Sequence, residues 1–469
     1  MTQSTPTEAD LWNYVRTPTI DAIAKIKRYK QGVSEGLITT DNNMLKHGYK
    51  SLFDSPPSGE RASFYNYNDL DGLQRLYQQV QSLPVVALKF LLPNDREEPL
   101  DFAKILLHEV AMIPILLADR YVAAHEDRVE VDETVLEYLY REQESYLLAD
   151  DLRMDVYVPI LGAQIAEESV FSKISIVRLS KAQQQSLADV PHVSPYDAGR
   201  LSAATHALKL ENVPAFAGGC GLYFALEPYE PTFELVEEFF EAASIESSSS
   251  IGYAQMLLEP IEWFGDIDHT GNTRSVYLFR DYATRIDNLT RHAGELNLDQ
   301  LAHVNLYFEK MSRSHPSIRV ATRRLSAART RDNDEDRIVD LCIGLEALLG
   351  GGSGSGEIVH KISLRAAAML SRYGWGGSGG ILSAIKDVYS YRSRVVHGVP
   401  GPHKKQLLHL DGMPIHASRL ALAALSQILR IALTVDGFNP DKVDEMFVYS
   451  ALDIAATHVT EKDCPNESN

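Results

Sequence analysis

The stretch that decides the fold of this chain runs from Ile381 to Gly398 and reads ILSAIKDVYSYRSRVVHG. Apolar residues recur in it at helical spacing, at Ile381, Ile385, Val388 and Val395. This period predicts a single amphipathic helix whose apolar stripe packs against other elements. The rest of the C-terminal half is best understood as the partners of this helix.

Two polar residues stand out on the predicted helix. Arg392 lies on the apolar stripe, and a guanidinium keeps its charge, so a buried one needs a partner. His397 lies at the end, where Gly398 suits a left-handed cap and Pro400 prevents continuation. The two side chains are separated by about 140° and about 7.5 Å, so they converge only if the helix packs beside a copy of itself. The alternative is an arginine held by an acidic neighbour and a capping histidine.

The surrounding sequence predicts further helices with short connections. Their expected ranges are Leu298–Ser312, Ile318–Thr330, Asp334–Leu349, Gly356–Tyr373, Gly380–His397 and His416–Thr434. Six successive helices with short loops are typical of a helical bundle. We therefore expect an all-α bundle from about residue 295 to 436.

Three motifs follow one another in this region. Asp336–Leu349 reads DRIVDLCIGLEALL, Glu357–Ala367 reads EIVHKISLRAA, and Tyr389–Gly398 contains Arg-x4-His-Gly. In this order the motifs resemble the signature patterns of the Apea-like branch of the HEPN superfamily. The resemblance covers the C-terminal third of the chain and predicts a HEPN-type bundle there.

The resemblance implies a metal-independent endoribonuclease that acts as a homodimer, in phage defence or growth arrest. His397 would serve as the acid–base group and Arg392 would hold the scissile phosphate, leaving a 2′,3′-cyclic phosphate. Ser393 and Glu346 complete the candidate catalytic set, Glu346 by orienting Arg392. Active relatives often carry Asn, Asp or His where this chain has Ser393. The alternative is a non-catalytic HEPN module for dimerisation and for binding RNA, nucleotide or protein.

Glu346 flanks the apolar positions of its helix, among them Cys342, which we expect in the core. A carboxylate at that edge should find a cation, and Arg392 and Arg365 are the candidates. A structural ion pair is the simpler interpretation of Glu346.

The formal net charge of −19 disfavours unspecific binding to polyphosphates, so RNA would need a local basic surface. Lys310 to Arg331 contains no acidic residue and several arginines. We take Arg323, Arg324 and the helix residue Arg394 as candidate RNA-binding residues. The alternative is a solvated face paired with the acidic run from Asp332 to Asp336.

The N-terminal half has mixed patterns, so the predicted fold class is α+β, with a mixed α/β N-terminal region followed by the all-α HEPN-type bundle. Expected strands are Val85–Leu92, Met154–Gly162, Lys173–Leu179 and Leu222–Leu226. Expected helices are Ile20–Tyr29, Leu73–Val80, Phe102–Ala124 with a break at Pro114, and Phe233–Ala243.

Composition suggests where the domains divide. We expect a mostly helical or irregular region over residues 1–80, a mixed α/β domain over 81–245, the bundle over 246–455 and a polar tail over 456–469. Ser247–Ser250 is the expected linker.

Three isolated cysteines, Cys220, Cys342 and Cys464, fit a reducing compartment. The N-terminus lacks the features of a signal peptide, and the longest apolar run is too short to span a bilayer. We therefore expect a cytoplasmic protein with no membrane partner. The glycine-rich stretches Gly350–Gly356 and Gly376–Gly380 lack a phosphate-binding ending, so we expect flexible connections there. His403, His409 and His416 lack a ligand spacing, so we expect neither cofactor nor metal.

Overall fold

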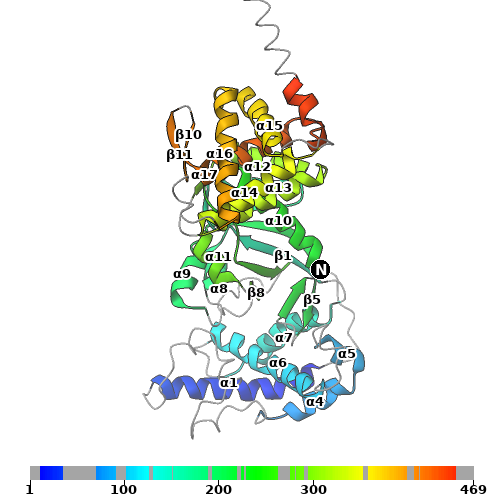
Figure 1. Ribbon diagram of the computed structural model, residues 1–469. Coiled ribbons are helices and arrows are strands. Elements are labelled where there is room, and N and C mark those ends of the chain that lie inside the picture. Colours follow the sequence, from blue (N-terminus) through cyan, green and yellow to red (C-terminus); the bar gives the residue numbers. More distant parts are fainter. Residues whose placement is uncertain are drawn as a thin grey trace, which may run out of the picture. The chain divides into compact units, whose positions relative to one another are not determined.

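In a computed structural model the chain forms two compact units, each built from several separate segments of the sequence (Figure 1). The first comprises Met1–Pro159, Lys173–Phe233 and Gln255–Arg280, and the second the remaining segments. The structure describes residues 11–34, 70–90, 102–125, 130–149, 152–188, 193–218, 223–226, 229–261, 275–279, 281–289, 294–351, 358–398, 406–410 and 412–449. Helices with an antiparallel sheet make this an α+β protein, as predicted. The boundaries expected at residues 81, 246 and 456 stay a prediction.

The first unit begins with helices that share one apolar core. They are α1 (Trp12–Ser34), α4 (Leu73–Gln81), α5 (Pro84–Lys89), α6 (Phe102–Ala124) and α7 (Glu133–Leu147). The helices predicted at Ile20–Tyr29 and Leu73–Val80 are confirmed as parts of α1 and α4.

The strand predicted at Val85–Leu92 is wrong, because the described part of that segment is α5. Pro84 occupies the first turn of this helix, where its missing N–H costs nothing. Ala87 and Phe90 are buried one turn apart, whereas Val85 is 76% exposed. Burial therefore follows a helical period, which a short apolar run does not reveal in the sequence.

The break predicted at Pro114 is also wrong, because α6 continues through this proline. Every residue from Val110 to Val122 is buried. An interior proline costs a helix roughly 3 kcal/mol. The free energy gained by burying the apolar surface of this whole segment is larger than that cost, so the helix continues.

The sheet of the first unit orders its strands β4–β5–β1–β7–β8, with β6 paired to β5. Their bounds are β1 (Leu152–Pro159), β4 (Ser175–Arg178), β5 (His206–Gly218), β6 (Tyr223–Leu226), β7 (Gln255–Pro260) and β8 (Ser275–Leu278). All these pairings are antiparallel. The strands predicted around Met154, Lys173 and Leu222 are confirmed. Two short helices, α8 (Lys181–Ala188) and α9 (Pro195–Leu201), connect β4 to β5.

The second unit contains the predicted helices, which cluster together in Figure 1. They are α12 (Leu298–Met311), α13 (Pro316–Thr330), α14 (Asp334–Leu349), α15 (Ile358–Arg372), α16 (Ser378–Val396) and α17 (Ala417–Thr434). The unit also holds α10 (Tyr229–Glu246) from Glu234 onward, α11 (Tyr282–Leu289), β2 (Ala163–Ile165), β3 (Ser169–Val170), β9 (Gly294–Leu296), η5 (Pro440–Lys442) and η6 (Asp444–Val448). All six predicted helices are confirmed, and the HEPN assignment stays a prediction.

Local signals explain where the two motif helices begin and end. The Asn333 side chain accepts a hydrogen bond from the Glu335 backbone at 2.8 Å and so caps the start of α14. At the C-terminal end of α16, Gly398 follows the last residues of the helix with a φ of +61°, which ends the helix after His397 as the sequence predicts.

Three expectations for this region need correction. A hairpin of β10 (Leu407–Leu410) and β11 (Met413–His416) interrupts the predicted all-α bundle. Ser247–Ser250 is not a free linker, because Ser249 Oγ donates to the Gly162 carbonyl at 2.7 Å and Ser250 Oγ to the Arg329 carbonyl at 2.6 Å. Ser378–Gly380, expected as a flexible connection, forms the first turn of α16.

Among the described helices, α17 alone is long and apolar enough to cross a membrane, by length and composition. Of its residues, 67% are buried inside the protein. This burial is what the central helix of a bundle requires, so α17 carries no separate argument for a membrane.

Arg365 on α15 is 1% exposed and holds the C-terminal end of the bundle together. It donates to both carboxylate oxygens of Asp444, at 2.8 and 2.5 Å. It also donates to the carbonyls of Leu349 and Gly351, at 2.8 and 2.7 Å. Arg365 therefore supplies hydrogen bonds to the backbone carbonyls at the end of α14 and holds the segment that follows α17.

Replacing Asp444 with alanine should destabilise the protein by about 3 kcal/mol, because it leaves the buried Arg365 without its counter-charge. Chemical denaturation measures this difference. Glu445→Ala is the control, since Glu445 is the exposed neighbour of Asp444 and should change stability little. If Asp444→Ala and Glu445→Ala lowered the free energy of unfolding equally, the ion pair would not be what holds this segment.

The same pair predicts a dependence on pH. Hydrogen bonds from Arg365 are the largest cause of the lowered pKa of Asp444. The stabilisation is therefore complete above the ordinary pKa of a carboxyl group and is lost as the pH falls through the lowered one. The difference between Asp444→Ala and the parent protein should shrink in acid, and denaturation at several pH values measures it.

Candidate functional site

The candidate site lies at the C-terminal end of α16. Ile381, Ile385 and Val388 are buried on the inner face of this helix and hold it against the bundle. Near the end of the helix this burial declines, since Val395 is partly exposed and Val396 is 52% exposed. The apolar stripe predicted from the sequence is therefore covered only over its first part.

Arg392 lies where the covered face ends. Its Nη2 atom is 4.0 Å from Oε1 of Glu346 on α14, and both side chains are about one-third exposed, at 31% and 32%. Its Nε atom is buried and has no hydrogen-bond partner. The pairing of Glu346 with Arg392 was one of the two predicted options. The other, Arg365, is taken by Asp444. Arg392 is thus only loosely held and keeps unused donors.

Two groups beside this ion pair remain protonated. Burial raises the pKa of the Cys342 thiol, and the Glu346 carboxylate raises it further. Burial likewise raises the pKa of Tyr389, whose hydroxyl donates to the Cys342 carbonyl at 3.2 Å. Cys342 is completely buried, as predicted for a core residue. Neither residue can supply an anionic nucleophile at neutral pH.

His397 and Ser393 are both exposed at the end of α16. The His397 backbone N–H donates to the Ser393 carbonyl at 3.0 Å, which places these residues one turn apart on the same side of the helix. Arg394 is partly buried, and its Nε atom has no hydrogen-bond partner. The end of α16 therefore carries two arginines and a histidine, of which Arg392 alone has a carboxylate, Glu346, at ion-pair distance within the described residues.

The two predicted RNA-binding residues on α13 have carboxylate partners. Arg323 Nε donates to Glu241 on α10 at 2.9 Å, and Arg324 Nη1 donates to Asp340 on α14 at 2.9 Å. Arg331 Nε donates to the other oxygen of Asp340, also at 2.9 Å. The alternative of pairing with the run Asp332–Asp336 does not describe these contacts, because the partners are buried carboxylates on neighbouring helices. These arginines have a packing role, and RNA binding by them stays a prediction.

Asp340 is 3% exposed and has two arginine partners. Replacing it should therefore lower the free energy of unfolding far more than replacing either arginine. We expect Asp340→Ala to lower stability by about 3 kcal/mol. Arg324→Gln and Arg331→Gln should each cost at most about 1 kcal/mol, since both arginines are partly solvated. Thermal or chemical denaturation tests this, with Asp436→Asn in an exposed pair as the control. A loss for Arg324→Gln as large as for Asp340→Ala would contradict the assignment.

In the part of the chain that the structure describes, no three His, Cys, Asp or Glu residues gather around one point. His409 and His416 belong to the β10–β11 hairpin, and His403 lies outside the described residues.

Sequence reasoning missed a cavity in the second unit that Arg329, Arg419 and the serine turn line together. Arg329 belongs to the basic run that the sequence singled out, but nothing in the sequence separates it from the paired arginines beside it. The serines of this turn were expected to form a linker. Only the assembled fold brings these residues to one place.

Comparisons with protein-family models, with curated proteins and with solved structures found no match to this chain. The HEPN resemblance therefore rests on the residues of the three motifs alone.

Proposed function

We propose that the second unit is a HEPN-type module that cleaves RNA without a metal ion, at the end of α16. One observation carries this proposal. Arg392 is a permanent cation with a buried, unused Nε donor, and it lies on the same helix end as the exposed imidazole of His397. Phosphoryl transfer to the 2′-hydroxyl needs these two kinds of group.

In the proposed reaction the 2′-hydroxyl of RNA attacks the adjacent phosphorus. His397 takes the proton from this hydroxyl, and the 5′-oxygen of the next nucleotide leaves. The bond to the 5′-oxygen breaks as the new bond to the 2′-oxygen forms, so the products are a 2′,3′-cyclic phosphate and a 5′-hydroxyl. The leaving oxygen takes a proton from an imidazolium, either the same His397 or its copy in a second chain.

Arg392 would stabilise the charge that develops on the phosphoryl oxygens, because its planar guanidinium offers parallel donors to them. Glu346 orients this guanidinium from 4.0 Å and leaves it free to turn toward a phosphate. Arg394 adds positive charge on the same helix end. Ser393 contributes a neutral hydroxyl, which can donate a hydrogen bond but carries no charge.

A homodimer would complete the site. Within one helix Arg392 and His397 point in directions about 140° apart, so two copies of α16 side by side bring an arginine of one chain near a histidine of the other. The exposed Val396 beside them supplies an apolar contact for such a pairing. We further propose a cytoplasmic setting and a role in growth arrest or defence against phage.

A non-catalytic binding module is the second candidate, and the contact between Arg392 and Glu346 favours it. In that case the ion pair fixes α16 to α14, and the helix end binds RNA, nucleotide or protein without cutting it. RNA binding that depends on Arg392, in a protein that never cleaves RNA, would support this candidate.

We expect His397→Ala and Arg392→Ala each to slow cleavage of single-stranded RNA by about 100-fold or more, since each removes a group that acts in the transition state. Ser393→Ala should have a smaller effect. Cleavage rates with a chelator present measure this. His409→Ala and Arg372→Ala are the matched controls, because both side chains are exposed elsewhere in the same unit. Folded His397→Ala and Arg392→Ala proteins that cut as fast as the controls would refute the proposal.

We expect Val396→Asp to dissociate the dimer, because it places a charge in an apolar contact. Light scattering of the parent protein should give twice the mass of one chain, and the variant should give the mass of one chain. Val320→Asp is the control on α13, since Val320 is 45% exposed. A parent protein that is monomeric at micromolar concentration would contradict the shared site.

A further inference from the structure

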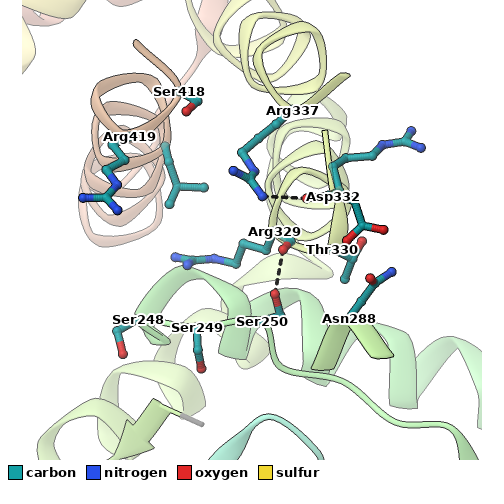
Figure 2. A pocket seen from close by; sticks show the side chains of 12 residues that line it. Ser248, Ser249, Ser250, Asn288, Arg329, Thr330, Asp332, Arg337, Ser418 and Arg419 are labelled. Carbon is teal, nitrogen blue, oxygen red and sulfur yellow. Dashed lines mark hydrogen bonds between the residues drawn. The ribbon is translucent and has the colours of Figure 1, made fainter. Parts of the chain in front are cut away.

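A second basic site lies in a cavity of about 420 Å³ in the second unit. Its walls are the serine turn Ser248–Ser250, the end of α13 with Arg329, and the first turns of α17 with Arg419 and Leu422. Figure 2 shows the Arg329 side chain extending from α13 toward α17 and the serine turn. None of the lining residues belongs to α16, so this site is separate from the one proposed for RNA cleavage.

The charges of this cavity do not balance. Four arginines line it, with Asp332 as the carboxylate among the lining residues. Each of the three nitrogens of Arg337 is engaged, since they donate to Asp334 and to the carbonyls of Ala328 and Arg331. Arg331 is paired with Asp340. Arg329 and Arg419 remain, and neither makes an ion pair with a residue in the described ranges.

Of these two arginines, Arg329 gives the stronger indication of an anion site, because it is the more deeply buried. Its Nε atom is buried and has no hydrogen-bond partner. Burial and the nearby guanidinium of Arg430 lower its pKa to about 10, so at neutral pH it is still a cation. The carboxylate of Glu246 is already engaged by Arg430 at 3.0 Å and by the Tyr307 hydroxyl at 3.0 Å. A largely buried cation without a counter-charge is costly, and an anion in the cavity would remove that cost.

Other groups at the cavity also favour an anion. The first turn of α17 has no side-chain cap, and its helix dipole adds positive potential, while the Ala417 N–H already donates to the Gln406 carbonyl. The amide of Asn288 can donate a hydrogen bond, and Leu422 offers an apolar wall. The hydroxyls of Ser249 and Ser250 are not available as donors, because they are bound to carbonyls. Their role is to hold the turn in place.

We propose that this cavity binds the phosphoryl group of a phosphorylated small molecule of mononucleotide size, with Arg329 as the principal anion-holding residue and Arg419 at the rim. Arginine guanidinium groups match phosphate oxygens with paired donors. The volume lies within the range of small-molecule sites, and the strongly negative chain disfavours a long polyanion such as RNA at this position. Phosphate contacts would hold the ligand, while Asn288 and Leu422 contact its uncharged part.

Calorimetry and thermal denaturation of the full chain in low-salt buffer test this, with inorganic phosphate, adenosine 5′-monophosphate and adenosine as probes. We expect phosphate and the monophosphate to bind and to raise the melting temperature, and adenosine not to bind. Arg329→Met should weaken phosphate binding at least about tenfold, because a charge-assisted hydrogen bond is lost. The same variant should melt at the same or a higher temperature without ligand, since it removes an unpaired buried charge.

Arg372→Met is the control for an exposed arginine of the same unit, and it should leave binding unchanged. Arg419→Gln gives a second reading that does not depend on Arg329, and it should weaken phosphate binding as well. The proposal is overturned if phosphate does not bind, or if adenosine binds as well as its monophosphate. It is also overturned if Arg329→Met binds phosphate normally, or if only an RNA oligonucleotide binds through Arg329. A melting temperature lowered by Arg329→Met, together with normal binding by Arg419→Gln, would assign Arg329 a structural role.

Discussion

A guanidinium that is removed from water must find a counter-charge, and the second unit is built around this constraint. The Arg365 guanidinium donates four hydrogen bonds, two to the Asp444 carboxylate and two to backbone carbonyls. Asp340 joins Arg324 and Arg331 across α13 and α14, and Glu241 binds Arg323 from α10. These contacts join the consecutive helices α13 and α14 and, across longer stretches of sequence, α10 to α13 and α15 to the segment after α17, while the apolar faces provide most of the stabilisation.

The two places where we propose a function depart from this pattern. Arg392 has its carboxylate at 4.0 Å and a buried Nε without a partner. Arg329 has no carboxylate partner in the described part of the chain and lies in a cavity. Incomplete pairing costs stability, so a folded protein that keeps such arginines gains if a substrate or ligand supplies the missing anion. Paired arginines such as Arg323 gain little from a phosphate, because they would first have to give up a carboxylate.

Much of the fold could be predicted from the sequence. The helical period located α14, and the helical period together with the capping residue Gly398 located α16. The errors arose where local signals are ambiguous or are overridden by burial, as at Pro114 and in the short apolar run that forms α5. The serine turn was misjudged because its hydrogen bonds reach Gly162 and Arg329, which are far away in the sequence.

The candidate site was predictable only in part. The Arg392–Glu346 contact was one of the options, because both residues flank apolar stripes of neighbouring helices. The partners of Arg323 and Arg324 were not predictable, since Glu241 and Asp340 reach them through the packing of whole helices. The isolation of Arg329 is likewise a property of the assembled bundle. A sequence shows which residues carry charge, and only the fold shows which charges are left over.

The central claim is that the end of α16 cleaves RNA by attack of the 2′-hydroxyl, with Arg392 and His397 as the acting groups. The chemical form of the RNA ends tests this most directly. RNA incubated with the purified protein and a chelator should carry 2′,3′-cyclic phosphates and 5′-hydroxyls, which end-labelling and mass spectrometry distinguish. Cleavage that requires magnesium and leaves 3′-hydroxyls and 5′-phosphates would contradict the account, because such a reaction uses water as the nucleophile and a different site.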